Sequence, residues 1–517
     1  MPRMLSELAA GISCLDRRGP AEAEIAGLAY DSRAVGPGFL FFALPGLHSD
    51  GQSFIGAAVQ TGAAAVVHRD ELPSYAPGVA YLRVADPRFA MSPIAAEFYG
   101  RPSRSLGVIG VTGTEGKSTT VYLIYQLLNL AGRKAGFFST VMSDTGSGER
   151  PNPEHQTTPE ATAVQRMLAE MRDSGCEFAV VESSSHGLSP RTNRLGDVAF
   201  DAGVFMNVTS EHLEFHGSWE RYRDDKANLF RALDKASHAK TIGGLSRELP
   251  AFGVACLDDD SAPYFAAATS KPTFFFSSKG RTPPSGPPGF LATGIRSDER
   301  GATFSIESGG ERAEARIELP GAFNVDNALA ALAAASGITG VPWKDFLPLL
   351  PKLKPVRGRM TRIDRGQSFE LLVDYAHTPS SFLTVFPPLR ERVTGKMICV
   401  FGSGGERDTE KRPRQGRIAA DWFDVVILAD EDPRGEDPAE LLEQIAAGCP
   451  ELPRGERLFI IPDRPSAIRK AFSLAGKGDL VALLGKGHEN SIIYKDGPIP
   501  YDEIGEAEKA LAELGYR

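Results

Sequence analysis

Short apolar runs alternate along the chain with longer stretches in which apolar residues recur at helical spacing. Residues 106–111 form an apolar run of strand length. The stretch that follows has the spacing of a buried helix, with apolar residues at Val121, Leu123, Ile124, Leu127, Leu128 and Leu130. Further strand-like runs end at Glu182 and cover residues 397–402. Alternating strands and helices are typical of α/β units on largely parallel sheets, so we predict an α/β fold.

The length predicts more than one hydrophobic core. A chain of 517 residues should contain about three domains. A turn-rich stretch at residues 98–103 and a Pro- and Lys-rich stretch at residues 348–355 are the expected boundaries, and the second is also our candidate hinge. We therefore predict a smaller α/β N-terminal domain and two larger α/β domains, with bounds at residues 1–100, 101–353 and 354–517.

Composition excludes several classes of protein. Hydrophobic residues at 42% and charged residues at 24% are ordinary for a soluble globular protein. The net charge of −9 argues against a dedicated nucleic-acid or membrane-surface binder. The five cysteines form no C-x-x-C pair, so we expect neither a disulfide framework nor a zinc site. No apolar run approaches the ~18 residues of a membrane span, and we expect a cytoplasmic monomer without membrane insertion.

A glycine-rich turn joins the strand at residues 106–111 to the helix that follows. Residues 110–120 read Gly-Val-Thr-Gly-Thr-Glu-Gly-Lys-Ser-Thr-Thr. Gly113 and Gly116 let backbone N–H groups approach phosphate oxygens, Lys117 can reach the β/γ phosphates, and Ser118 can ligate Mg²⁺. The turn is one residue longer than the usual phosphate loop, and the alternative is an accidental Gly-rich turn. We predict a nucleoside triphosphate site.

Phosphate loops occur in proteins of many functions, and other motifs in this chain distinguish among those functions. Glu182 ends an apolar strand, where a Mg²⁺ ligand is expected; the alternative is a surface turn residue. The further motifs are Gln-Thr-Thr-Pro at 156–159, Glu-His-Leu-Glu-Phe-His-Gly at 211–217, Tyr-Arg-Asp-Asp-Lys-Ala-Asn-Leu-Phe at 222–230, Leu-Pro-Gly-Ala-Phe-Asn at 319–324, Phe-Gly-Ser-Gly-Gly-Glu-Arg-Asp at 401–408 and Gly-Lys-Gly-His-Glu at 485–489.

In this order the motifs resemble those of the Mur ligases of peptidoglycan precursor synthesis, over nearly the whole chain. Together with residues 31–51, the motifs at 401–408 and 485–489 are most similar to members that add the third, diamino residue of the stem peptide. The resemblance implies a central P-loop ATPase-type parallel sheet and a Rossmann-like C-terminal domain. It also implies ATP-driven amide formation, in which a carboxylate of a UDP-N-acetylmuramoyl dipeptide becomes an acyl phosphate that the amine of a diamino acid attacks.

The resemblance also implies the ATP site and its metals. The ATP contacts would be Thr112, Gly113, Thr114, Glu115, Gly116, Lys117, Ser118, Thr119, Asn324, Asn327, Arg359 and Asp374. The catalytic residues would be Lys117, Glu182, His212 and Lys226. Two Mg²⁺ ions would be held by Ser118, Glu182, His212 and Lys226. An ammonium cannot ligate Mg²⁺, so Lys226 would act as its carbamate; the alternatives are a solvated helix lysine at Lys226 and helix caps at the two asparagines.

Residues for the UDP-sugar peptide follow from the same resemblance. They would be Ser32, Leu47, His48, Ser49, Gln156, Thr157, Thr158, Ser184 and Arg194. The segment from 188 to 194 is two residues longer than in the family, which leaves Arg191 as the alternative to Arg194.

The amino-acid site would be formed by Arg407, Glu431, Asp432, Pro433, Arg434, Gly485 and Glu489. Relatives that use meso-diaminopimelate carry Asp-Asn-Pro-Arg here, and Asp432 replaces the asparagine. An ionised aspartate only accepts hydrogen bonds and repels a carboxylate, which favours L-lysine or L-ornithine. Arg434 suits a carboxylate and favours meso-diaminopimelate, so that substrate stays open.

One residue of the phosphate loop departs from the family. Glu115 replaces the usual asparagine, and a carboxylate near a triphosphate predicts weaker ATP affinity. The alternative functions are an amide ligase of the folylpolyglutamate or cyanophycin kind, and a nucleotide-binding protein that has lost turnover.

Overall fold

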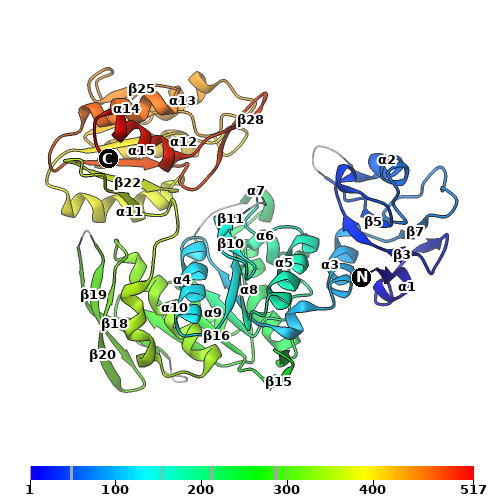
Figure 1. Ribbon diagram of the computed structural model, residues 1–517. Coiled ribbons are helices and arrows are strands. Elements are labelled where there is room, and N and C mark those ends of the chain that lie inside the picture. The colour runs from blue at the N-terminus through cyan, green and yellow to red at the C-terminus, as the bar shows by residue number, and fades with distance from the viewer. Residues whose placement is uncertain are drawn as a thin grey trace. The chain divides into compact units, whose positions relative to one another are not determined.

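The computed structural model describes residues 2–46, 50–152, 154, 156–209, 213–284, 289–298 and 300–517 (Figure 1). These residues form two compact units. The first is Met1–Ala292, Ile306–Ala313 and Asp326–Leu349, and the second is Thr293–Ser305, Glu314–Val325 and Leu350–Arg517. The finer division into three domains stays a prediction. Within the described ranges, no helix is both long enough and apolar enough to span a bilayer.

The first unit begins with a small mixed sheet. Its strand order is β2 (Asp16–Arg18), β7 (Ala80–Arg83), β6 (Ala65–His68), β5 (Phe39–Phe42) and β4 (Gly27–Ala29). The elements around it are β1 (Arg3–Met4), β3 (Glu24–Ile25), α1 (Leu5–Leu8), α2 (Ile55–Gln60), α3 (Pro87–Phe98) and the 3₁₀ turns η1 (Ser32–Ala34), η2 (Gly51–Phe54) and η3 (Pro102–Ser105). Leu40, Val67 and Leu82 on the strands pack with Met91 and Ile94 of α3, so burial of the apolar strand faces holds this sheet to its helices.

A larger sheet forms the centre of the first unit. Its order runs β11 (Arg150–Pro151), β10 (Met142–Asp144), β9 (Ala135–Phe138), β12 (Phe178–Glu182), β8 (Gly107–Thr112), β13 (Ala202–Phe205), β16 (Phe252–Cys256), β17 (Thr273–Ser277) and β18 (Phe290–Ser297). The strands from β9 to β17 pair in parallel. The sheet continues after β18 with β19 (Ala302–Ser308) and β20 (Glu311–Ile317), and β14 (Ala239–Ile242) and β15 (Leu245–Glu248) pair in a separate two-stranded sheet.

Helices cover both faces of this sheet. Val108 and Val181 pack in one cluster with residues of α5 (Ala161–Asp173) and α8 (Trp219–Lys235). Because successive strand residues face opposite ways, their neighbours face α4 (Lys117–Leu130), which contacts β8, β9 and β12. The other helices are α6 (Ser185–Leu188), α7 (Leu213–His216), α9 (Ala262–Ala266), α10 (Phe323–Thr339) and the 3₁₀ helix η4 (Trp343–Lys352).

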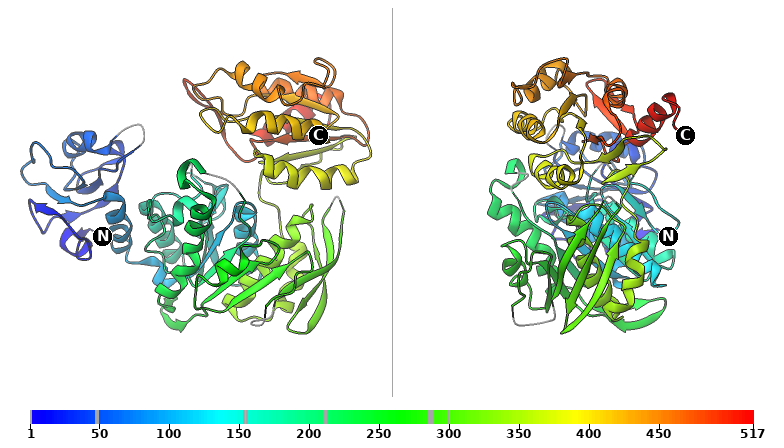
Figure 2. Two further views of the ribbon diagram at one scale, coloured as in Figure 1. Left: turned by 180° about the vertical axis from the view of Figure 1, so that it is seen from behind. Right: turned by 90° about the vertical axis from the view of Figure 1, so that its left-hand side faces the viewer.

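The second unit contains a doubly wound sheet. Its order is β21 (Thr361–Ile363), β22 (Glu370–Asp374), β26 (Leu480–Leu484), β23 (Met397–Phe401), β24 (Val425–Leu428) and β25 (Leu458–Ile460). Alternate strand residues pack on α11 (Pro379–Arg392), α12 (Lys411–Trp422) and α13 (Pro438–Ala446), and the others pack on α14 (Arg464–Leu474) and α15 (Glu503–Glu513). Figure 2 shows these two helical layers on either side of the strands. A hairpin of β27 (Ser491–Tyr494) and β28 (Gly497–Pro500) completes the unit.

The elements agree with most of the sequence predictions. The α/β class, the central parallel sheet and the Rossmann-like C-terminal sheet are confirmed. The predicted strand at 397–402 is β23, and the predicted strand ending at Glu182 is β12. The linker predicted at 348–355 is not wholly irregular, because η4 continues to Lys352.

Candidate functional site

The phosphate loop lies between the end of β8 and the start of α4. Gly116 has φ +81° and directly precedes Lys117, the first residue of α4. A Cβ at position 116 would lie 2.7 Å from Asn327 Oδ1, so backbone and space both require glycine. The Lys117 ammonium donates to Thr114 O at 2.8 Å. The unpaired N–H groups that begin a helix form an anion site, so the loop has the geometry for a phosphate chain.

Asn207 fixes the shape of this loop. Its side-chain Oδ1 accepts hydrogen bonds from Thr114 N at 3.1 Å and from Glu115 N at 2.8 Å. The Thr114 hydroxyl lies 3.1 Å from the Tyr222 hydroxyl and accepts from Thr209 N at 3.0 Å. Two residues at the ends of the loop are also predicted to contact ATP. Thr112 lies at the end of β8, and Thr119 lies in the first turn of α4.

Glu182 connects the phosphate loop to the predicted sugar-peptide segment. Its Oε2 accepts from Ser118 Oγ at 2.9 Å and from Thr140 N at 2.8 Å, and its Oε1 accepts from Thr140 Oγ1 at 3.0 Å. The Thr140 hydroxyl in turn lies 3.1 Å from Thr157 Oγ1. The backbone oxygen of Glu182 accepts from Thr158 Oγ1 at 2.8 Å. One residue at the end of β12 therefore contacts both substrate segments.

The residues beside this carboxylate fit a magnesium ion. Ser118 Oγ and the Glu182 carboxylate are oxygen donors in contact with each other, and both side chains are buried. Mg²⁺ prefers such hard oxygen ligands beside phosphate. Of the two other predicted metal ligands, His212 lies outside the described residues and Lys226 lies beside the phosphate loop.

Lys226 lies at the loop rather than in solvent. It is 2% exposed, its Nζ donates to Gly113 O at 2.6 Å, and the amine stands 4.4 Å from the centre of the Tyr222 ring. The alternative of a solvated helix lysine is therefore wrong. Lys226 lies on α8, and His216 helps to position this helix. The His216 ring contacts Asp225 of α8 at 2.7 Å and Ser185 Oγ, shortly after β12, at 3.1 Å, so these contacts hold α8 near the end of β12.

The residues predicted to meet the nucleotide base lie at the start of α10. Asn327 Oδ1 accepts from Thr120 Oγ1 at 3.1 Å, while Asn324 Nδ2 donates to Pro320 O at 2.7 Å. In the second unit, Asp374 is fully buried and accepts from the backbone N–H groups of residues 360 and 376. Burial raises the pKa of Asp374, although the Arg359 charge opposes this.

The predicted sugar-peptide residues are only partly described. Leu47, His48 and Ser49 lie outside the described residues. Ser32 lies in η1, whose preceding Asp31 caps Arg33 N at 2.9 Å, and Gln156 is exposed. The Thr158 hydroxyl lies 2.9 Å from Ser184 Oγ.

The two candidate arginines point to different places. Arg194 donates to Thr158 O at 2.8 Å and pairs with Glu160 at 2.8 Å. Arg191 instead donates to Phe215 O and stacks on the Phe215 ring, with 4.0 Å between guanidinium and ring centre. The structure therefore brings Arg194, and not Arg191, to the Thr-Thr-Pro segment.

Glu431 is a buried carboxylate of the predicted amino-acid site. Its Oε2 has no hydrogen-bond partner in the described part of the chain. Gly485, with φ +94°, allows this close packing, because a Cβ there would lie 2.8 Å from the same oxygen. Burial raises the pKa of Glu431, while the cationic groups of Lys411, Lys486 and Arg464 act in the opposite direction. Glu431 thus presents an unsatisfied acceptor.

Asp432 is less available than the sequence suggested. Its Oδ1 accepts from Lys486 Nζ at 2.8 Å and from Ile493 N at 3.0 Å. Lys486 also contacts Glu489, whose Oε1 accepts from Tyr375 Oη at 3.1 Å. Lys486 is fully buried and pairs with both Asp432 and Glu489, so the Asp432 oxygen is already engaged by a cation that two carboxylates share.

The remaining residues of the predicted amino-acid site are Pro433, Arg434 and Arg407. Gly405 N donates to Asp432 O at 2.8 Å, and Pro433 is buried beside Gly405. Arg434 has φ +55° and a buried Nε without a partner among the residues described. Arg407 is exposed.

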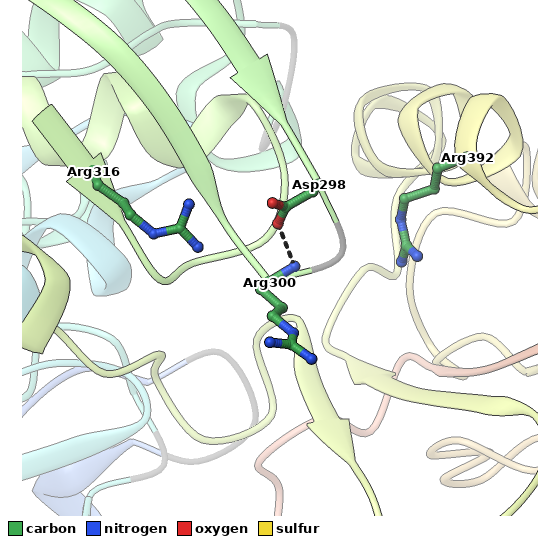
Figure 3. A pocket seen from close by; sticks show the side chains of 4 residues that line it. All are labelled: Asp298, Arg300, Arg316 and Arg392. Carbon is green, nitrogen blue, oxygen red and sulfur yellow. Dashed lines mark hydrogen bonds between the residues drawn. The ribbon is translucent and has the colours of Figure 1, made fainter. Parts of the chain in front are cut away.

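A separate depression of about 450 Å³ is lined by Asp298, Arg300, Arg316 and Arg392 (Figure 3). Arg316 pairs with Glu318 at 2.7 Å, and Arg392 binds both oxygens of Glu370 at 2.6 and 2.7 Å. None of the predicted site residues lines it.

Sequence reasoning missed several groups. Thr140 and Glu160 had no predicted role, whereas Tyr222 and Lys486 lie inside the motifs at 222–230 and 485–489, and Asn207 ends a further motif, Phe-Met-Asn at 205–207. The motif order signalled these three residues without giving any of them a role. Glu160 directly follows the Gln-Thr-Thr-Pro motif and Thr140 stands next to no distinctive pattern, and only the fold brings these two residues to the site.

Comparison with known proteins follows this geometry. Residues 111–335 match the Mur ligase middle domain, residues 358–487 match the Mur ligase glutamate ligase domain, and residues 24–99 match the Mur ligase family catalytic domain. A UDP-N-acetylmuramyl-tripeptide synthetase of Treponema denticola is 56% identical over 93% of this chain and 90% of that protein.

Proteins named for diaminopimelate are also similar. A UDP-N-acetylmuramoyl-L-alanyl-D-glutamate--2,6-diaminopimelate ligase of Syntrophomonas wolfei is 36% identical over 99% of this chain and 98% of that protein. A solved structure with the same activity name has a TM-score of 0.64 and 28% identity, and each chain is covered fully. The chain belongs to the Mur ligase family of ATP-dependent amide ligases.

Proposed function

We propose that this enzyme joins a diamino acid, L-lysine or L-ornithine, to the free carboxylate of UDP-N-acetylmuramoyl-L-alanyl-D-glutamate in peptidoglycan synthesis. ATP would convert that carboxylate to an acyl phosphate, and the amine would displace phosphate. The relatives named tripeptide synthetases support the acceptor and the added third residue. The observation that carries the choice of amino acid is the buried oxygen of Glu431 that has no hydrogen-bond partner among the described residues.

At the ATP end, the chain supplies positive charge and oriented donors. The N–H groups at the start of α4 and the Lys117 ammonium would hold the phosphates, and fixed donors of this kind stabilise charge that moves between oxygens. Ser118, Glu182, His212 and carbamylated Lys226 would hold Mg²⁺, which when bound neutralises phosphate charge. Glu182 and Thr140 would keep Thr157 and the acceptor peptide in register with the γ-phosphate, since alignment lowers the barrier to attack.

At the amino-acid end, the balance of charge favours a side-chain ammonium. Asp432 is already paired with Lys486, whereas Glu431 has a carboxylate oxygen without a partner among the described residues. A terminal ammonium would satisfy that oxygen, whereas the second carboxylate of meso-diaminopimelate would be repelled by it. Arg434 would then structure the loop instead of binding a distal carboxylate, and Arg407 would bind the α-carboxylate.

The test is product formation with each amino acid. Purified protein is incubated with UDP-N-acetylmuramoyl-L-alanyl-D-glutamate, ATP and Mg²⁺ plus L-lysine, L-ornithine or meso-diaminopimelate, and products are identified by mass. We expect tripeptide with L-lysine or L-ornithine and at least about tenfold lower kcat/KM with meso-diaminopimelate, the loss of one charge-assisted contact. Product with meso-diaminopimelate alone would refute the choice. ADP release that needs no UDP-sugar would instead indicate a ligase of the folylpolyglutamate kind.

A further inference from the structure

Glu160 is a buried carboxylate shared by two arginines. It is the residue before α5 and is 6% exposed. Its Oε1 accepts from Arg194 at 2.8 Å and from Arg88 at 3.2 Å, and the two arginine side chains are 14% and 21% exposed. Although it stands at the N-cap position, its side chain caps no backbone N–H of the helix. The carboxylate is therefore used to hold the arginines.

The two arginines lead to two parts of the predicted UDP-sugar-peptide site. Arg194 also donates to the backbone oxygen of Thr158 at 2.8 Å. Arg88, in α3, also donates to Pro45 O at 3.1 Å, two residues before the predicted UDP-sugar-peptide contacts at 47–49, which we call the nucleotide segment. Glu160 thus connects the acceptor segment with the start of the nucleotide segment through one oxygen.

The charges in this cluster do not balance. In the ranges that the structure describes, the ion pairs of Arg88 and Arg194 are both made with Glu160, so two cations share one anion. Arg194 Nε and Glu160 Oε2 are buried and lack partners within those ranges. A surplus of buried positive charge is costly without an anion, and the acceptor of the proposed reaction brings a peptide carboxylate and a diphosphate.

We infer that Glu160 is a positioning residue for the UDP-sugar peptide: it orients the Arg194 guanidinium at Thr158 and, through Arg88, fixes the start of the nucleotide segment. The inference rests on the proposed function. It predicts the direction in which substrate affinity changes when the carboxylate is neutralised. A carboxylate that acted only through its charge would repel the anionic substrate, so its neutralisation would tighten binding, whereas loss of a positioning carboxylate weakens binding.

The test compares Glu160→Gln, which keeps the shape and removes the charge, with Glu170→Gln on the same helix. Among the arginines that the structure describes, Glu170 forms ion pairs with Arg150 and Arg166 and with no other. We expect Glu160→Gln to raise KM for UDP-N-acetylmuramoyl-L-alanyl-D-glutamate about tenfold or more, the loss expected for a hydrogen bond to a charged group, with KM for ATP and for the amino acid within twofold. Glu170→Gln should leave all three KM values unchanged.

A double-mutant cycle separates positioning from a general structural effect. If Glu160 acts through Arg194, Glu160→Gln should have a smaller effect in an Arg194→Met background than alone, with a remainder no larger than the effect of Arg88→Gln, because coupled residues are not additive. Additive effects, or a lower or unchanged KM in the single variant, would overturn the inference. Should Glu160→Gln fold poorly, Arg88→Gln, which removes only the second pairing, should still raise the same KM, and no rise there would also overturn it.

A direct binding measurement distinguishes a failure of the proposed function from a failure of the positioning role of Glu160. If wild-type protein formed no amide product, the proposed function would fail. Calorimetry with UDP-N-acetylmuramoyl-L-alanyl-D-glutamate alone would still decide the role of Glu160, since an unchanged Kd in Glu160→Gln would refute it and a tenfold weaker Kd would support it.

Discussion

The Asp326→Asn substitution should stabilise the protein in a pH-dependent way. Asp326 lies in the first turn of α10, its Oδ1 is buried without a partner among the described residues, and burial raises the pKa of its carboxyl from 3.8 to about 6. The negative charge of Asp258 acts in the same direction, while the Ser278 hydroxyl and Lys279 oppose it. The folded protein therefore holds this proton more tightly than the unfolded chain does.

The sign and size of the effect follow from linkage. A folded-state pKa above the unfolded value means that the free energy of unfolding falls as pH rises from 3.8 to 6, and the whole cost is present above that range. A shift of roughly two units corresponds to about 3 kcal/mol. Asparagine keeps the shape and an acceptor for Ser278 but has no charge. Asp326→Asn should thus gain up to about 3 kcal/mol near pH 7.5 and almost nothing near pH 4.

Urea unfolding at several pH values measures this difference. Because the chain forms two compact units, unfolding need not be two-state, and hydrogen exchange of α10 should report the unit that contains Asp326. The exposed Asp345 in η4 provides the control, and Asp345→Asn should leave the pH profile unchanged. An Asp326→Asn variant that is no more stable at pH 7.5, or whose gain is equal at pH 4 and pH 7.5, would refute the reasoning.

Three further predictions concern the proposed reaction. Glu431→Gln should raise KM for L-lysine or L-ornithine about tenfold at pH 8 and leave KM for ATP unchanged. Since burial raises the pKa of Glu431, the wild-type KM should rise as pH falls while the variant stays flat; a parallel pH profile would contradict this role. Glu115→Asn should lower KM for ATP a few-fold by removing a like charge near the phosphates, and an unchanged KM at low ionic strength would count against that repulsion. Lys226→Ala should reduce amide formation by about 100-fold or more, and wild-type activity should fall after removal of CO₂ and return with bicarbonate; activity indifferent to CO₂ would exclude the carbamate.

The sequence predicted the parts of the site that lie on one element or one motif. The order strand, Gly-rich turn and helix specifies β8, the phosphate loop and α4, because local spacing sets both the helix start and its free N–H groups. Glu182 was likewise predicted from its place at the end of an apolar run. Such features depend on neighbours in the chain, which a sequence displays directly.

Contacts between distant segments could not be predicted in this way. Thr140, just after β9, meets Glu182 because β9 and β12 pair in parallel, and Thr157 is reached through the Thr140 hydroxyl. Asp432 was interpreted as a free charge, and the structure pairs it with Lys486, 54 residues away along the chain. The sign of a charge is visible in a sequence, but whether a counter-charge neutralises it depends on the tertiary fold.

The position of Glu182 has a consequence for the order of events. Its carboxylate contacts Ser118 of the phosphate loop, and its backbone oxygen contacts Thr158 of the acceptor segment. Any shift of this residue on binding one substrate must therefore change the other segment. Linkage makes such an effect reciprocal: if ATP alters the affinity for the UDP-sugar peptide by some factor, the UDP-sugar peptide alters the affinity for ATP by the same factor. The residue at the end of β12 would then couple the binding equilibria of the two substrates.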